Sequence, residues 1–387
     1  MRKRLISVVI LFGSVALAVG LAELGLRLAH YGEASRTHLV NFTEYDPVLG
    51  WRHRPNASGE VSNDEYQTTV QYDSNGLRGL SRPYKRPQGV FRIVVLGDSF
   101  VDGYTVQAQN RLTEVLEASL GPRFEVVNLG VPGYSTDQEL LLLEQEGWKY
   151  EPDLVVLAFY YNDVWGNGSR YFANSTTTQK PLFVTDAGGN LSLTNVPVPR
   201  STQTLHSRLK VYELIRRAIR SNPRLFSLTV KMGLAHGKLP DDSHPAPTGA
   251  MGGSQEFLVY QRTQTPELTR EWTITQALLR KLKKETEQRG IRLLIFYVPT
   301  RVELSLDEWS SAQLPPDYDP GEVARRLVGI CTAEGIAYIE PSDRFKAAAK
   351  QASLYFHRDP HWNAAGHHLA GEILAEYVRS NWQKTVQ

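Results

Sequence analysis

The chain has 387 residues, a formal net charge of +2 at pH 7 and an apolar fraction of 41%. A chain of this length can bury a sizeable core as one large domain or as two, and its balanced charge excludes the strong overall field that attracts nucleic acid. Cys331 is the only cysteine, so an intramolecular disulfide is excluded. Its apolar neighbours predict a small buried side chain rather than a nucleophile.

The N-terminus departs from this average composition. Basic residues occupy positions 2–4, and an uncharged run follows over residues 5–22. As a helix, this run would be about 27 Å long, enough for a bilayer core, and the basic cluster predicts a cytoplasmic N-terminus with the rest translocated. We expect residues 1–30 to form a membrane anchor that contacts the lipid bilayer through residues 5–22. A cleaved signal segment and a buried helix are the alternatives.

Residues 31–90 are polar and rich in turn signals. Asn75-Gly76 stands between the strand-like residues 68–72 and Leu77, which is the arrangement that closes a hairpin. We therefore expect residues 31–90 to be a small β-rich segment that precedes the main domain, residues 91–387.

From Phe91 onward, short apolar runs alternate with helical patterns. Runs rich in Val, Ile and Leu are typical of strands buried on both faces of a parallel sheet, and here they span 91–96, 124–127, 153–159, 291–298 and 336–339. The expected helices span 112–120, 136–148, 266–289, 323–334 and 364–380. This alternation predicts an α/β fold, a three-layer α/β/α sandwich around a five-stranded, mainly parallel sheet.

An insertion of about residues 164–265 separates the third and fourth strands. It contains an amphipathic stretch at 205–220 and a stretch rich in Gly, Pro, Ser and Asp at 236–256. A region this long within a compact domain is usually a lid, a specificity element or disorder.

Polar residues follow the first and last predicted strands, at the sheet edge where open parallel sheets bind ligands. Ser99 follows the first strand in Gly97-Asp98-Ser99, and Asp359-Pro360-His361 follows the fifth. A serine hydroxyl is a weak nucleophile that needs a base. In the turn at Pro360, the Asp359 carboxylate can reach Nδ1 of His361 and stabilise the imidazolium that forms when this histidine takes the serine proton. We expect Ser99, His361 and Asp359 to be nucleophile, base and orienting carboxylate.

Two further motifs predict donors for an oxyanion. Gly133 follows the second strand, just before a helix whose first residues, Ser135 to Gln138, match a capping box. A backbone N–H in that position favours developing negative charge. Asn162 follows the third strand, and its side-chain amide can donate to the same oxyanion. Taken singly, Gly133 would also fit a plain glycine-rich turn, and Asn162 would fit a helix cap or Asx-turn slightly better than an oxyanion donor. Asp163 is expected to be structural.

The four motifs, in this order, resemble those of the SGNH/GDSL hydrolases, over roughly residues 91–380 without the insertion. The resemblance implies a flavodoxin-like sheet, ester substrates, no metal and no cofactor. It also implies that the Ser99 N–H joins Gly133 and Asn162 in the oxyanion hole. Phe100 stands where the family often has leucine, Tyr160 where it usually has glycine, and one residue rather than two separates the Asp and His of the last motif.

Leu49-Gly50-Trp51 and the segment from Asn75 to Gly79 look like those of membrane-tethered bacterial relatives. We expect an extracytoplasmic serine esterase that cleaves O-acyl esters, most simply acetyl esters, on carbohydrate. The alternatives are an O-acyltransferase with the same triad, a lipid-active lysophospholipase or thioesterase, and a non-catalytic glycan-binding module. The expected partners are the acylated carbohydrate and the bilayer, without nucleic acid, and the sequence leaves the oligomeric state open.

Overall fold

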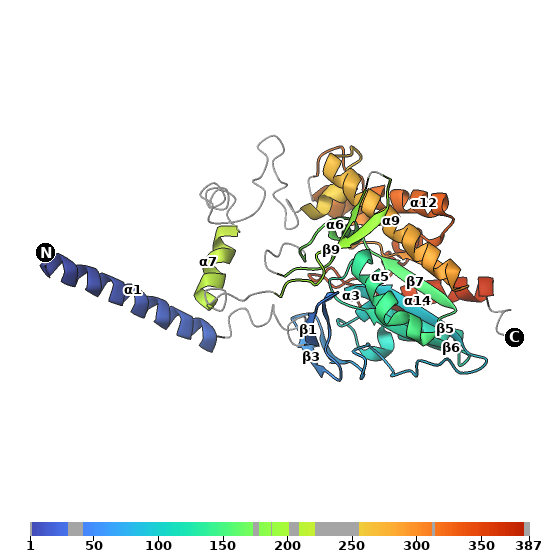
Figure 1. Cartoon of the computed structure of the whole chain (residues 1–387), viewed down its shortest axis with the longest axis horizontal. Helices are drawn as coiled ribbons and strands as arrows, with labels where there is room; N and C mark the ends of the chain where they lie inside the picture. The colour runs from blue at the N-terminus through green and yellow to red at the C-terminus, as the bar shows by residue number, and fades with distance from the viewer. Residues whose placement is uncertain are drawn as a thin grey trace. The chain divides into compact units, whose positions relative to one another are not determined.

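The computed structural model describes residues 2–29, 42–172, 178–186, 188–200, 209–220, 255–311 and 314–382. The chain forms two compact units, which are Met1–Val40 with Ser201–Ala246, and Asn41–Arg200 with Pro247–Gln387. Figure 1 shows the elements along the chain. The stretch rich in Gly, Pro, Ser and Asp at residues 236–256 lies outside the described residues, except for its last two residues.

The first unit contains helices α1 (Arg2–Leu28) and α7 (Lys210–Arg220). The Val211 N–H donates to the Glu23 carboxylate at 2.9 Å. Helix α7 confirms the second part of the amphipathic stretch predicted at 205–220. Within the described part of the chain, no helix combines the length and the apolarity that crossing a bilayer requires. The anchor predicted through residues 5–22 therefore gains no support from the structure.

The second unit is built on one parallel sheet of five strands, in the spatial order β11-β10-β7-β5-β6. The strands are β5 (Phe91–Gly97), β6 (Phe124–Gly130), β7 (Leu154–Phe159), β10 (Arg292–Tyr297) and β11 (Ala337–Ile339). Numbered along the chain, this order is 2-1-3-4-5, the flavodoxin-like arrangement. All five predicted strands are present, and β5, which precedes Ser99, pairs with β6 on one side and β7 on the other.

Helices cover both faces of this sheet, which confirms the three-layer sandwich (Figure 1). On one face lie α5 (Thr136–Gln145), α9 (Pro266–Gln288) and α12 (Glu322–Glu334), and on the other lie α4 (Leu112–Leu120), α13 (Ser342–Ala349) and α14 (Ala364–Trp382). Strand residues alternate between the two layers, since Leu96 packs with the first set and Val95 with the second. Cys331 lies on the buried side of α12, and burial raises the pKa of its thiol to about 12, as expected for a structural cysteine.

Two antiparallel hairpins precede the sheet. They are β1 (Thr43–Asp46) with β2 (Gly50–His53), and β3 (Ser58–Ser62) with β4 (Gln67–Gln71). The turn predicted at Asn75-Gly76 closes a single bridge between Tyr72 and Arg78. Shorter elements complete the unit: α3 (Ser99–Asp102), η1 (Ala108–Asn110), η2 (Gly147–Tyr150), α6 (Asn162–Asn167), β8 (Leu182–Thr185), β9 (Leu191–Thr194), η4 (Gln255–Tyr260), α10 (Arg301–Leu304) and α11 (Leu306–Ser311).

Candidate functional site

Ser99 is the first residue of α3, the short helix that follows β5. The carboxylate of Asp98 caps this helix by accepting the Phe100 N–H at 2.9 Å. Space here is tight, because a Cβ on Gly97 would lie 2.3 Å from the Val101 side chain. The glycine therefore lets the chain turn sharply out of the sheet, and the cap holds the serine at the carboxyl edge.

Ser99, His361 and Asp359 form one hydrogen-bonded chain. Nε2 of His361 lies 2.7 Å from Oγ of Ser99, although the two residues are 262 positions apart. Nδ1 of His361 lies 2.5 Å from Oδ1 of Asp359, which also accepts the His361 backbone N–H at 3.0 Å. Burial raises the pKa of Asp359, but the hydrogen bonds and charge of His361 outweigh it, so this pKa is lowered. An ionised carboxylate beside a histidine beside a serine is the arrangement that activates a hydroxyl for attack.

The turn that carries His361 is fixed by the start of α14. Oδ1 of Asn363 accepts the N–H groups of Ala365 and Gly366 at 2.9 and 3.2 Å, so Asn363 is the predicted N-cap. Its amide nitrogen donates to the Ser353 carbonyl at 2.8 Å. The imidazole of His361 packs on Phe100, with ring centroids 5.0 Å apart. Local capping and packing therefore set the position of the ring.

The two predicted oxyanion donors follow the strands on either side of β5. Gly133 lies between β6 and α5 with φ at +79°, and a Cβ there would lie 2.2 Å from the Phe172 ring, so only glycine fits. Asn162 begins α6 after β7, and its side chain hydrogen-bonds to Asp98. Its Oδ1 is buried without a hydrogen-bond partner among the described residues. Asp163 accepts the Tyr160 N–H at 3.0 Å, a structural role as predicted.

The electrostatics near the serine are set by burial. Asp98 is buried, which raises the pKa of its carboxyl to about 6, while hydrogen bonds from Phe100 and Asn162 and the charge of His361 act in the opposite direction. The carboxyl is thus an acceptor that orients the Asn162 amide, and its own ionisation depends on pH.

Two departures from the family pattern pack against each other. The Phe100 and Tyr160 rings have centroids 4.6 Å apart, and both side chains are buried. The tyrosine therefore fills core space beneath the serine helix. The larger residue at each position fits the other, which accounts for both changes by packing.

Sequence reasoning missed two residues beside Asp359. Tyr66 donates its hydroxyl to Oδ2 of Asp359 at 3.1 Å, and Glu65 accepts the Asp359 N–H at 2.8 Å. Both lie in the turn between β3 and β4, almost 300 residues away in the chain. No local pattern connects these segments, and the polar turn 63–66 was the only available signal.

The competing histidines have other surroundings. His367 is buried against Trp362, and burial lowers its pKa to about 3. His368 is exposed and lies near Glu372, and His357 is exposed. These surroundings leave His361 as the histidine in contact with the serine.

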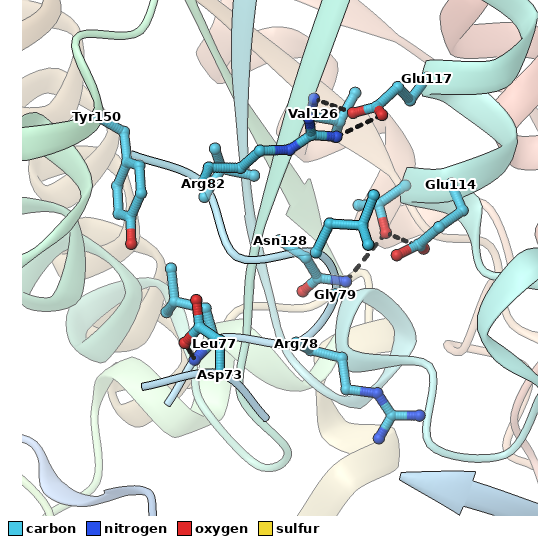
Figure 2. Close-up of a pocket in the computed structure, with 13 residues that line it drawn as sticks. Asp73, Leu77, Arg78, Gly79, Arg82, Glu114, Glu117, Val126, Asn128 and Tyr150 are labelled. Atoms are coloured by element: carbon cyan, nitrogen blue, oxygen red, sulfur yellow. Dashed lines mark hydrogen bonds and ion pairs between the residues drawn. The ribbon is translucent and has the colours of Figure 1, made fainter. Parts of the chain in front are cut away.

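A separate pocket lies elsewhere in this unit (Figure 2). This pocket is lined by residues from the segment before β5, from α4 and from β6, together with Tyr150 of η2. The residues from the first three elements are Asp73, Leu77, Arg78, Gly79, Leu80, Arg82, Thr113, Glu114, Glu117, Val126, Val127 and Asn128. Arg82 pairs with Glu117 at 2.5 Å, and Asn128 donates to Thr113 at 3.0 Å. None of the triad residues lines this pocket, so it is not the candidate active site.

The chain resembles known proteins most clearly in its last third. Residues 254–387 match a family described as an SGNH hydrolase-like domain, acetyltransferase AlgX. Among solved structures, the acetyl xylan esterase AlAXEase has 12% identity over 74% of this chain and 100% of its own, with a TM-score of 0.40. The lipase/acylhydrolase from Enterococcus faecalis has 12% identity over 75% of this chain and 96% of its own, with a TM-score of 0.38. At these TM-scores neither likeness bears on activity. No curated protein matches the chain.

The matched segment carries Asp359 and His361, the residues that reach Ser99 through hydrogen bonds. The glycine and asparagine motifs follow the two strands that flank the strand of this serine. Its last third is thus similar to an SGNH hydrolase-like domain, and the four motifs that resemble those of the SGNH/GDSL hydrolases follow strands of one parallel sheet.

Proposed function

We propose that this chain is a serine esterase that cleaves O-acyl esters, most simply acetyl esters, on carbohydrate. The observation that carries the proposal is the unbroken hydrogen-bonded chain from Oγ of Ser99 through His361 to Asp359, with separations of 2.7 and 2.5 Å. These are the distances at which a base takes a proton from a nucleophile.

The reaction has two halves. Oγ of Ser99 attacks the ester carbonyl while Nε2 of His361 takes its proton, and the charge on Asp359 stabilises the imidazolium. The N–H groups of Ser99 and Gly133 and the amide of Asn162 hold the oxyanion. The tetrahedral intermediate collapses, His361 gives its proton to the departing alkoxide, and the alcohol leaves an acyl-enzyme. Water, deprotonated by His361, then releases the acid and frees the serine.

A second candidate function is transfer of the acetyl group to a sugar hydroxyl in place of water. It is favoured by the match of residues 254–387 to a family described as an acetyltransferase. Phe172, from the predicted insertion, lies over Gly133 and packs edge-on against Trp51 with ring centroids 5.2 Å apart. We infer that these aromatic side chains, which lie beside a proposed oxyanion donor, screen the acyl-enzyme from water.

We further propose that the enzyme works outside the cytoplasmic membrane, with residues 1–30 as a retained or cleaved export segment. Residues 31–90 would then be a small β-rich segment that precedes the main domain, residues 91–387. The basic positions 2–4 and the uncharged run 5–22 support export. Fractionation of cells that produce the full chain tests it, since recovery of the protein in the cytosolic fraction would contradict export.

The test of function compares the full chain with Ser99→Ala. The wild-type protein should hydrolyse a small chromogenic acetate ester and react covalently with a fluorophosphonate, and Ser99→Ala should do neither, because it lacks the attacking oxygen. A wild-type protein that is folded yet inactive and unlabelled would refute the proposal and leave glycan binding as the alternative.

Adding a xylan-type oligosaccharide acceptor to the same assay separates hydrolysis from acetyl transfer, since a transferase converts it to an acetylated product. A preference for long acyl chains over acetate would indicate the lipid-active alternative.

A further inference from the structure

The turn between β3 and β4 is a rigid polar structure that faces the last motif. Oδ1 of Asn63 accepts the N–H groups of Glu65 and Tyr66 at 2.8 and 3.0 Å, and the Asn63 N–H donates to the Tyr66 carbonyl at 2.9 Å. These bonds fix the backbone of the turn, so its last two side chains point in defined directions.

Glu65 binds the backbone that leads to Asp359. Its carboxylate accepts three consecutive N–H groups, those of His357 at 2.6 Å, Arg358 at 3.0 Å and Asp359 at 2.8 Å. Three donors from successive residues converge on one carboxylate only when that backbone is curved around it. The Glu65 side chain therefore fixes the conformation of the segment from which Asp359 extends.

Tyr66 binds the carboxylate itself. Oδ1 of Asp359 faces His361, and the Tyr66 hydroxyl donates to Oδ2 at 3.1 Å, so each oxygen has its own partner. Burial and the charge of Asp359 raise the pKa of the Tyr66 phenol, which keeps it a donor at neutral pH. The ring also packs against Phe356, with centroids 5.0 Å apart. A carboxylate held at both oxygens cannot rotate away from the histidine.

We propose that Glu65 and Tyr66 are positioning residues, through which the β3–β4 hairpin holds the Asp359–His361 pair in its working geometry. The segment before the sheet is then part of the active site. This inference rests on the proposed serine mechanism. Tyr66 touches no reacting atom in it and acts only through Asp359.

The experiment uses the full chain and a double-mutant cycle. Tyr66→Phe removes only the hydroxyl and should lower kcat for the acetate ester about 10-fold, since a hydrogen bond to a charged group is lost, while KM stays unchanged. The rate of fluorophosphonate labelling should fall in parallel. In an Asp359→Asn background, Tyr66→Phe should have no further effect, because the group through which it acts has been altered. Glu65→Gln should also lower kcat, because an amide nitrogen would face a backbone donor.

Tyr45→Phe is the matched control. The Tyr45 hydroxyl donates to the Val198 carbonyl at 2.6 Å, so this variant also removes one phenol hydrogen bond from the same segment, to an acceptor that is not a triad residue. It should keep the wild-type kcat. Thermal unfolding of every variant verifies folding.

Three results would overturn the inference. Tyr66→Phe and Glu65→Gln could both retain wild-type kcat while Ser99→Ala is inactive, which would leave the serine mechanism standing and remove only the positioning role. Tyr66→Phe could cost as much in the Asp359→Asn background as in wild type, which would make the effect one of general stability. An inactive, unlabelled wild-type protein would end the proposed function and this inference together.

Discussion

Asp98 links the nucleophile to an oxyanion donor. One carboxylate caps the helix that begins with Ser99 and also hydrogen-bonds the Asn162 amide. An amide held in this way can direct its second N–H toward the site without reorganisation. Because removing one oxyanion donor typically costs ~10²–10³ in turnover, Asn162→Ala should lower kcat by that factor with little change in KM. Steady-state kinetics on an acetate ester measures this.

Asn381→Ala is the control for that substitution. Asn381 is exposed near the end of α14 and donates to the Tyr377 carbonyl within its own helix. It should leave kcat unchanged. If Asn162→Ala retained turnover within threefold of wild type, the amide would serve only as a hydrogen-bond partner of Asp98 and not as an oxyanion donor.

For single residues, the sequence predicts the contacts that depend on neighbours in the chain. Asp359 and His361 are two residues apart and meet within one turn, and Asn363 caps the next helix as its side chain predicts. Tyr66 could not be found in this way, because its bond to Asp359 depends on how two distant segments fold together. Long-range polar contacts leave no periodic signal.

The end of strand β6 lies close against the backbone of helix α3. A Cβ on Gly130 would lie 2.2 Å from the Asp102 nitrogen and 2.6 Å from the Val101 carbonyl carbon, and both are backbone atoms of α3. Backbone cannot move aside as a side chain can, so Gly130→Ala should displace the helix that begins with Ser99. We expect a lower unfolding temperature together with a loss of activity. Thermal unfolding and kcat measure the two effects.

Gly329→Ala gives the opposite expectation. Gly329 lies inside α12, where an added Cβ would meet no atom within 4 Å. Alanine in a helix interior is favoured over glycine by ~0.5–1 kcal/mol. This variant should unfold at a slightly higher temperature with unchanged kcat. A loss of activity here would mean that replacing a glycine disturbs the fold even where the added Cβ has room, and the explanation for Gly130 would fail.

Element prediction succeeded where apolar periodicity was strong and failed where tertiary contacts decide. The strands and the helices α4, α9, α12 and α14 lie within two residues of their predicted bounds, apart from the longer C-terminal end of β6.

The capping box predicted at Ser135 is wrong, since this side chain makes no capping bond. Asp137 instead accepts the Gln138 N–H at 2.8 Å and binds the buried Lys180 at 2.7 Å. Asp137, held by Lys180 from the insertion, thus accepts the N–H that the capping box assigned to Ser135.

Across the whole molecule, buried carboxyl groups gather beneath the carboxyl edge of the sheet. Both oxygens of Glu139 are buried without hydrogen-bond partners among the described residues. Burial, and then the neighbouring charges of Asp163 and Asp98, raise the pKa of Glu139, while burial and Asp98 raise that of Asp163. A folded state that keeps these acids protonated must have a stability that depends on pH.

The sign follows from proton linkage. An acid whose pKa is raised by folding holds a proton that the unfolded chain has already released, so stability falls as pH rises from the unfolded pKa through the folded one. For Asp98 this window runs from 3.8 to about 6, and for Glu139 it opens at 4.5 and extends upward. The protein should therefore unfold at a lower temperature at pH 8 than at pH 5.

Glu139→Gln tests the source of that difference. The amide cannot ionise, so the variant should unfold at a higher temperature than wild type at pH 8 and show a smaller gap between pH 5 and pH 8. Glu287→Gln makes the same substitution on the exposed face of α9, where the side chain is 60% exposed, and should leave the gap unchanged. Calorimetry at both pH values gives all the temperatures. A gap as wide in Glu139→Gln as in wild type would mean that Glu139 ionises freely in the folded protein, and its burial would not govern the pH response.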